Sequence, residues 1–207
     1  MQKLNTPTEY RRQLRKRILE VASLEFRSKG IRSVKMDDIA NSLSISKRTL
    51  YEIYENKEQL LMETVKEECN SFDTCMEAYA KGDKHHAIEV LTEFYRLQMK
   101  SLAVVTPAYF IELQKCPQIL EWLMNNREQR RCNAKQFFED GIREGYFRGD
   151  VNYELITRIS TGMMDYIMEN RLYNNYAMKD ILRNGVLLYI RGFCTLKGIE
   201  ELDKHTI

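Results

Sequence analysis

The side chains best suited to chemistry lie in one short segment, residues 36–57. Ile39 and Leu43 give its first part an apolar face at helical spacing. Ser46 is expected to start a second helix, because a serine side chain accepts from a backbone N–H two or three residues further on. If Leu50 faces inward, the polar side chains of this second helix face outward and reach a DNA groove. The segment therefore predicts a helix-turn-helix whose outward residues are Lys47, Arg48, Thr49 and Tyr51.

Cations stand at the start of every helix predicted in this region. The amino end of a helix carries partial positive charge, so a cation there is unfavourable by about 0.3–1 kcal/mol. A bound phosphate reverses this effect, since backbone N–H groups and cationic side chains hold it together. A solvated lysine without a role is the simpler interpretation for any one of them, but the group favours phosphate contact. The cations are Lys35, Lys47, Arg48 and Lys57.

Charge is divided unevenly along the 207 residues. The net charge is only +2, but residues 1–57 hold 13 Lys and Arg against 7 Asp and Glu. The remaining 150 residues hold 19 against 23, so the two parts carry +6 and −4. A basic amino-terminal part is the expected position of a nucleic-acid site.

Several classes of function lack their motifs here. The five cysteines form no C-x-x-C pair, and no grouping with the three histidines has metal-ligand spacing, so we expect neither a metal nor a cofactor. We find no nucleophile elbow, zinc-protease motif or phosphate loop, so we do not expect an enzyme. No apolar run approaches the roughly 20 residues that cross a bilayer, which predicts a soluble, cytoplasmic protein.

Helical periodicity and few breakers predict an all-α fold of about nine helices. A first helix ends at Gly30, and Asn56 starts a long helix that leaves the basic region. Glycines at 141, 145 and 149 mark a loop, followed by two final helices at about 152–174 and 180–197. We therefore expect a three-helix DNA-binding domain in residues 1–56, and a larger helical domain in residues 57–207.

The chain resembles the TetR family of bacterial transcriptional regulators. The likeness in motif covers about residues 10–61, and the rest is similar in helix number, length and the glycine-rich loop. The departures from the family pattern are Val34, Lys35, Ser44, Arg48 and Ile53, of which Ser44 replaces a turn glycine and Arg48 a small residue. The matching positions are Gly30, Ile39, Ala40, Ile45, Ser46, Thr49, Leu50, Tyr51, Tyr54, Lys57, Glu58, Leu60 and Leu61.

The resemblance implies a transcriptional regulator that binds double-stranded DNA, most often a repressor on a near-palindromic operator. Lys47, Tyr51 and Lys57 are then expected to hold phosphates. Arg48, and with it Thr49, is the candidate for base contacts, with a preference for guanine. Leu50 and Tyr54 are expected to pack the small domain instead. The full set of implied DNA contacts is Lys35, Lys47, Arg48, Thr49, Tyr51 and Lys57.

The resemblance also implies a homodimer and a small-molecule ligand of unknown identity. Two apolar surfaces on the last helices support a dimer, although the same side chains could instead face their own core. A stripe of aromatic and methionine residues could line a ligand pocket, but such stripes are more often ordinary core. The dimer candidates are Gly162, Ile167, Val186, Tyr189, Ile190 and Phe193, and the pocket candidates are Phe94, Met99, Tyr109, Trp122, Met163 and Tyr166.

Two other functions remain open from the sequence. The helix-turn-helix could serve a sequence-independent DNA-binding or nucleoid module. Less in keeping with the motif, the chain could be a helical enzyme or lipid carrier with an incidental basic end.

Overall fold

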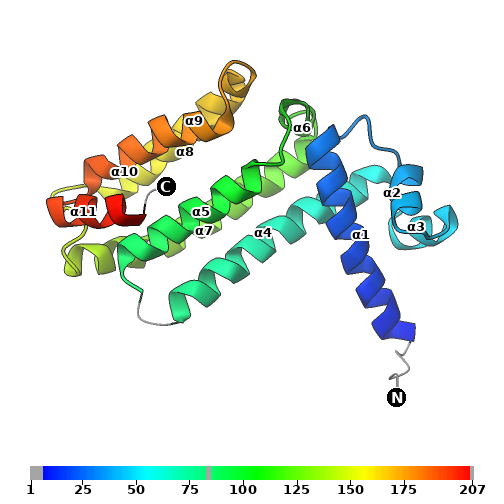
Figure 1. Ribbon diagram of the computed structural model, residues 1–207, viewed down its shortest axis with the longest axis horizontal. Helices are drawn as coiled ribbons and strands as arrows, with labels where there is room; N and C mark the ends of the chain where they lie inside the picture. Colours follow the sequence, from blue (N-terminus) through cyan, green and yellow to red (C-terminus); the bar gives the residue numbers. More distant parts are fainter. Residues whose placement is uncertain (1–6, 83–84, 206–207) are drawn as a thin grey trace. The chain divides into compact units, whose positions relative to one another are not determined.

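The computed structural model describes residues 7–82 and 85–205, without the side chains of residues 7–8, 127–133, 164 and 182. These residues are all-helical, as predicted (Figure 1). The helices number eleven in the described residues, more than about nine, because the predicted helix over 180–197 is divided. They are α1 (Pro7–Lys29), α2 (Met36–Ser42), α3 (Lys47–Ile53), α4 (Lys57–Lys81), α5 (Ala87–Leu102), α6 (Pro107–Leu113), α7 (Pro117–Arg143), α8 (Tyr153–Glu169), α9 (Met178–Ile181), α10 (Leu187–Phe193) and α11 (Leu196–His205), with a 3-10 turn η1 (Leu172–Asn174) and a π-helical turn η2 (Leu182–Val186).

The chain forms two compact units, each described by itself. Unit 1 comprises the described residues up to 71 together with 104–119, and unit 2 comprises 72–103 and 120–207. Unit 1 is larger than the expected domain of residues 1–56, because it includes the first part of α4 and all of α6. Among the described residues, no helix has a stretch long and apolar enough to span a bilayer.

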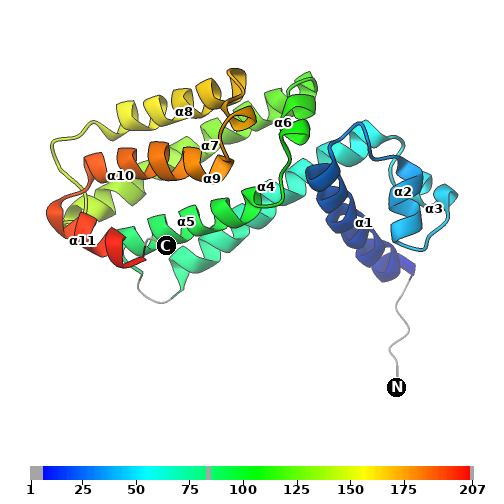
Figure 2. The ribbon, with the colours of Figure 1, turned by 45° about the horizontal axis from the view of Figure 1, so that its top comes forward.

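The core of unit 1 forms where α1, α2, α3 and the start of α4 meet (Figures 1 and 2). The buried side chains of α1 recur every four residues, so they share one face of that helix. Leu50 of α3 and Tyr54 are also buried, in agreement with the packing role predicted for them. The α1 members of this core are Leu14, Ile18, Ala22 and Phe26.

The short helix α6 packs against the end of α1 within unit 1. Gly30 ends α1 with φ +86°, and a Cβ added to it would lie 3.1 Å from the Cβ of Ala108 on α6. The Glu112 carboxylate accepts from the Arg32 backbone N–H at 2.8 Å. The Thr106 backbone N–H donates to the Arg27 carbonyl at 2.9 Å. Hydrogen bonds from both ends of α6 therefore fix the last turn of α1 and the turn that follows it.

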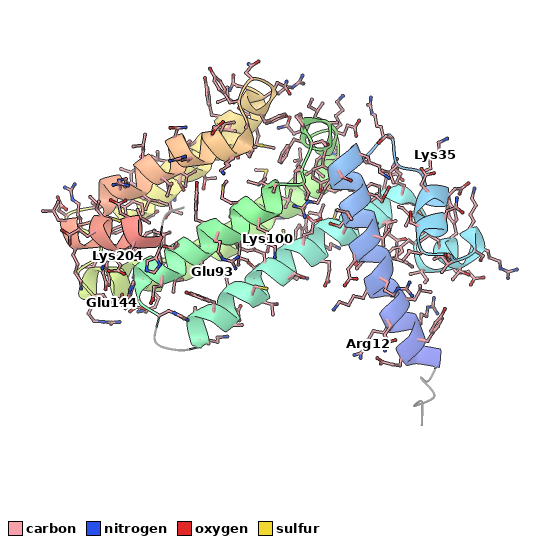
Figure 3. All side chains as sticks on the ribbon, viewed as in Figure 1. Arg12, Lys35, Glu93, Lys100, Glu144 and Lys204 are labelled. Carbon is pink, nitrogen blue, oxygen red and sulfur yellow. The ribbon has the colours of Figure 1, made fainter. Side chains whose placement is uncertain are left out.

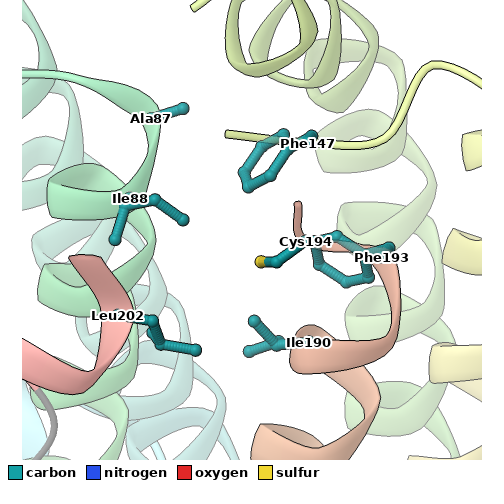
Figure 4. Close-up of a cluster of buried hydrophobic side chains, with 7 residues drawn as sticks. All are labelled: Ala87, Ile88, Phe147, Ile190, Phe193, Cys194 and Leu202. Atoms are coloured by element: carbon teal, nitrogen blue, oxygen red, sulfur yellow. The ribbon is translucent and has the colours of Figure 1, made fainter. Parts of the chain in front are cut away.

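Unit 2 is built around a cluster of buried hydrophobic side chains that includes Phe147 and Phe193 (Figure 4). The Phe147 ring lies 5.4 Å from Phe193 and 5.5 Å from Phe137, at edge-on angles that favour aromatic pairs. A Cβ at Gly141 would overlap the Phe147 ring, so that helix position has to be glycine. The other members of the cluster in Figure 4 are Ala87, Ile88, Ile190, Cys194 and Leu202.

The loop after α7 divides the predicted last helix. The Arg148 backbone N–H donates to the Phe193 carbonyl at 3.0 Å, and the Thr195 N–H donates to the Tyr146 carbonyl at 2.9 Å. These two bonds replace helical ones, so Cys194 takes an extended conformation and α10 ends there. A Cβ at Gly198 would lie 2.2 Å from the Tyr146 carbonyl oxygen, so glycine allows α11 to approach the loop closely.

Candidate nucleic-acid interface

The start of α3 is fixed by Ser46. Its Oγ accepts from the Thr49 backbone N–H at 3.0 Å, while its own backbone is extended. This confirms the cap predicted from the sequence. Beneath the helix Leu50 is fully buried, so α3 has one face packed against unit 1 and the other in solvent.

The turn before α3 depends on Ser44, which adopts φ +54°. This left-handed conformation costs a non-glycine residue about 1–2 kcal/mol. The Ser44 and Ile45 backbone N–H groups donate to the Asn41 and Ala40 carbonyls, both at 3.0 Å. The tight turn between α2 and α3 is thus formed without the glycine that the family pattern has at this position.

Three of the predicted contact side chains form the outer face of α3. Arg48 is the most open of them, with 88% of its side chain exposed, while Lys47 is 60% exposed. The Tyr51 residue is 42% exposed, and the Lys47 ammonium lies 5.9 Å from the centre of its ring. A flat ring and two cations on a solvent-facing helix are suited to phosphate and base contacts.

Carboxylates pair with both cations of this face. The Lys47 Nζ lies 2.8 Å from an Asp37 oxygen, and the Arg48 Nε donates to Glu52 at 2.8 Å. Hydrogen bonding to these carboxylates raises the pKa of Lys47 and of Arg48, so both remain charged. Exposed ion pairs contribute little to stability, so phosphates can replace the two carboxylates at low cost.

The other predicted contacts differ in their accessibility. Lys35 is exposed where α2 begins (Figure 3). Thr49 is partly buried, with its Oγ1 2.7 Å from the Ser46 Oγ. Lys57 is also partly buried, and its Nζ donates to the Val34 carbonyl at 2.7 Å. Its ammonium therefore holds the turn between α1 and α2, a structural role that the charge pattern did not reveal.

The basic first turns of α1 contain a neighbour of α3 that was not among the predicted contacts. The Arg11 guanidinium donates to the Glu52 carbonyl at 3.3 Å, at the carboxyl end of α3. Arg12 is paired with Glu9, and the Arg15 guanidinium lies 5.5 Å from the Tyr54 ring centre. The sequence offered only the clustering of arginines, which fits a solvated face equally well.

The predicted pocket residues lie in different surroundings. Tyr109 is buried in unit 1, whereas the other five belong to unit 2. Tyr166 is 59% exposed on α8, and Phe94 packs edge-on against Phe72 with 43% of its surface exposed. Trp122 and Met163 are partly buried. A cavity in unit 2 has Met99 in its wall and, among its described lining residues, none of the other five.

The predicted dimer residues are divided between exposed, partly buried and fully buried positions. Gly162 is exposed on α8, while Val186 and Tyr189 are partly buried. The remaining three, Ile167, Ile190 and Phe193, are at most 6% exposed within unit 2. This is the core role that the sequence left open as the alternative.

Leu155 and Ile159, two members of an exposed apolar stripe on α8, were missed. Leu155, Ile159 and Tyr166 are each at least half exposed, and they share one helix face with Gly162 at spacings of four, three and four residues. On α10, Leu188 is 66% exposed. The helical spacing was the signal that could have identified this stripe.

Comparisons with known proteins agree with the geometry of α2 and α3. Residues 18–64, from Ile18 of α1 to Thr64 of α4, match the sequence model of the family described as bacterial regulatory proteins, tetR family. The HTH-type transcriptional repressor KstR2 of Mycolicibacterium smegmatis is 24% identical over 152 residues, which are 70% of this chain and 72% of that protein.

Solved structures share the fold at low sequence identity. The ketosteroid transcriptional regulator KstR2 of Mycobacterium tuberculosis is 18% identical, with a TM-score of 0.57 over 94% of this chain and 100% of that one. A transcriptional regulator from Cytophaga hutchinsonii is 19% identical, with a TM-score of 0.66 over 86% and 97% of the two chains.

Proposed function

We propose that the chain is a cytoplasmic repressor of the TetR family of DNA-binding transcriptional regulators, whose sequence model matches residues 18–64. It binds a near-palindromic operator as a homodimer and leaves it when a small ligand binds. The observation that carries this proposal is the outer face of α3, where Lys47, Arg48 and Tyr51 are exposed above the buried Leu50. The similarity to a curated repressor supports repression as the direction of control.

The proposed contacts have different tasks. Lys35, Lys47 and Tyr51 bind phosphates and set the orientation of α3 on the duplex, without regard to sequence. Arg48 reads bases, because its exposed guanidinium can donate to both O6 and N7 of a guanine. Such a pair discriminates against a wrong base by about 1–3 kcal/mol. Lys57 supports the α1–α2 turn in place of the direct phosphate contact first expected.

The homodimer forms through the exposed stripe on α8 and through Leu188 on α10. In a monomer, Leu155, Ile159 and Tyr166 leave a row of apolar surface in contact with water, whereas a second copy would bury that surface. Gly162 lies within the row and has no group within 4 Å of an added Cβ, so a partner helix can approach closely there. A twofold pairing of α8 and α10 makes a four-helix interface.

Selection from a random duplex library tests the proposal. We expect the protein to enrich an inverted repeat whose half-sites lie about 34 Å apart, one helical turn along the duplex. The variant Arg48→Ala should lose the enrichment at particular bases. Lys29→Ala, which removes an exposed cation at the end of α1, should keep it.

The result also separates the alternatives. Retention of DNA without an enriched motif would favour the sequence-independent nucleoid module. A protein that retains no duplex even at low salt would contradict both DNA-binding functions.

A further inference from the structure

A cavity of about 360 Å³ lies in unit 2, between α5, the segment α9–η2–α10, and α11. This volume is in the range of small-molecule sites. Its walls are formed from residues far apart in sequence, and α11 packs directly on α5. The apolar lining residues are Leu91, Met99, Ala103, Leu187, Ile190 and Leu202.

The same cavity is lined by four cations and a histidine. Arg96 and Lys100 come from α5, Lys179 and Arg183 from α9 and η2, and His205 from α11. The composition does not lead one to expect this cluster, since residues 58–207 carry a net charge of −4. Lys100, Lys179 and Arg183 are exposed, so their charges lie on the solvent side of the cavity and attract an anion that enters it.

Two of these five side chains already have carboxylate partners. Arg96 makes two bonds of 2.6 Å to Glu93, and His205 lies 3.2 Å from Glu201. In the described part of the chain, Lys100, Lys179 and Arg183 form no ion pair. Figure 3 shows Glu93 and Lys100 on the same helix, α5. The positive charge available to a ligand therefore comes from opposite walls, α5 and α9–η2.

The wall that carries Arg183 is also irregular. Residues Leu182–Val186 form a π-helical turn between α9 and α10. Such turns are rare and are frequent at functional sites, because they insert a residue into a helix and redirect its side chains. Arg183 lies within this turn, and Leu187 follows it directly.

We propose that this cavity binds a small amphipathic anion, with a carboxylate or phosphate head and an apolar body. The head lies among Lys100, Lys179 and Arg183, and the body lies against Leu91, Leu187 and Leu202. The proposal deepens the proposed function, on which it rests, by giving the chemical class of the effector. Because the head neutralises charge on two walls, binding draws α9–η2 towards α5.

A matched set of probes tests this assignment on the full-length protein in the absence of DNA. Dodecanoate, dodecanol and dodecyltrimethylammonium share one chain and differ in the charge of the head. Isothermal titration below the micellar concentration should find dodecanoate bound at least about tenfold more tightly than the other two, as one charge-assisted bond of about 1.5 kcal/mol implies. Inorganic phosphate alone should bind weakly, because it lacks the apolar body.

Two variants separate charge from shape. Lys100→Met and Arg183→Met keep an apolar stem and remove the charge, so each should weaken dodecanoate by about tenfold and leave dodecanol unchanged. Lys135→Ala removes an exposed α7 cation outside the cavity and should change neither. A phosphate-headed probe, dodecyl phosphate, distinguishes a phosphate ester from a carboxylate as the preferred head.

Equal affinity for all three heads would overturn the anion site. So would a loss of dodecanoate affinity in Lys135→Ala equal to that in Lys100→Met and Arg183→Met. This outcome is distinct from a failure of the proposed function, which is measured on duplex DNA without any amphiphile. If operator binding holds and dodecanoate binds without weakening it, the cavity is an anion site but not the effector site, and the assignment as effector is wrong.

Discussion

Ser44 holds a backbone conformation that favours glycine, at the turn on which the position of α3 depends. The turn bonds to Asn41 and Ala40 offset its strain. Next to it, Arg48 and Lys47 extend into solvent from the first turn of α3. Substitutions in the turn, at the phosphate contact and at the base contact should therefore have separate effects.

Ser44→Gly should stabilise the protein. Relief of the left-handed strain is worth about 1–2 kcal/mol, and the greater chain entropy of glycine removes about 0.5–1 kcal/mol of it. We expect a net gain of about 0.5–1 kcal/mol in the free energy of unfolding, measured by chemical denaturation.

The matched control is Ser42→Gly, in the last turn of α2. There glycine replaces a helical serine, which should cost about 0.5 kcal/mol. If both variants lose stability alike, the turn at residue 44 is not strained.

Lys47→Ala should weaken binding to operator and scrambled duplexes by the same factor, because a phosphate contact carries no sequence information. The slope of log K against log salt concentration should become shallower by about 0.9. Fluorescence anisotropy across a salt series measures both quantities. A loss confined to the operator would instead make Lys47 a base contact.

Among the elements, α6 is the one whose position most constrains unit 1. It contacts the end of α1 through Gly30 and bonds the α1–α2 turn through Glu112. Close by, α4 contributes the partly buried carboxyl of Glu68, which accepts from the Ser23 hydroxyl of α1 and lies 3.8 Å from the Arg27 guanidinium. The charged groups that meet at this place come from α1 and α4.

Glu68 should make stability depend on pH. Burial raises the pKa of this carboxyl, an effect larger than the opposing bonds from Ser23 and Arg27. The folded state therefore favours the protonated form. The contribution of Glu68 to stability is then fully present below its unfolded pKa of about 4.3, and it is lost as pH rises through the folded pKa.

Glu68→Gln should flatten this part of the pH profile of unfolding, since an amide does not titrate. Glu67→Gln removes an exposed carboxyl one residue away and should leave the profile as in the wild type. Thermal unfolding between pH 4 and pH 8 checks both variants. An unchanged slope in Glu68→Gln would mean that another group titrates.

Local sequence signals made much of the helix-turn-helix predictable. The Ser46 cap and the buried face with Leu50 follow from residue type and spacing within a few positions. The left-handed turn at Ser44 was indicated only by the family pattern, which has glycine there. The bond from Lys57 to the Val34 carbonyl joins residues 23 positions apart, so no local pattern reports it. The early end of α10 likewise depends on bonds from the loop after α7.

The cavity was not predictable either, because its walls come from segments that are far apart in sequence. Its walls combine α5 with residues near the carboxyl end, and α11 was not expected as a separate helix. The aromatic stripe indicated mostly other side chains. Phe94 and Tyr166 lie exposed and Tyr109 lies in the core of unit 1, whereas Met99 does line the cavity. Charge clustering across α5 and α9 appears only once the helices are folded together.

For the whole molecule, the account requires two copies acting together, since one α3 covers only half of a near-palindromic site. The proposed surface for pairing is the exposed stripe on α8. Operator affinity and dimerisation are therefore linked, and weakening one weakens the other.

Ile159→Arg should disrupt the dimer, because it buries an unpaired charge in the centre of the stripe. A cost of about 2–5 kcal/mol raises the dimer dissociation constant by well over tenfold. Sedimentation equilibrium should then find monomers. The control Met124→Arg changes an exposed residue of α7 and should remain dimeric, while a dimeric Ile159→Arg would move the interface elsewhere.

The most direct measurement of the central claim is anisotropy of Arg48→Ala and wild type on two duplexes, the selected operator and a scrambled copy. If α3 enters the groove with its outer face, the variant loses about 1–3 kcal/mol per half-site on the operator and much less on the scrambled duplex. Equal affinity of variant and wild type for the operator would contradict the account.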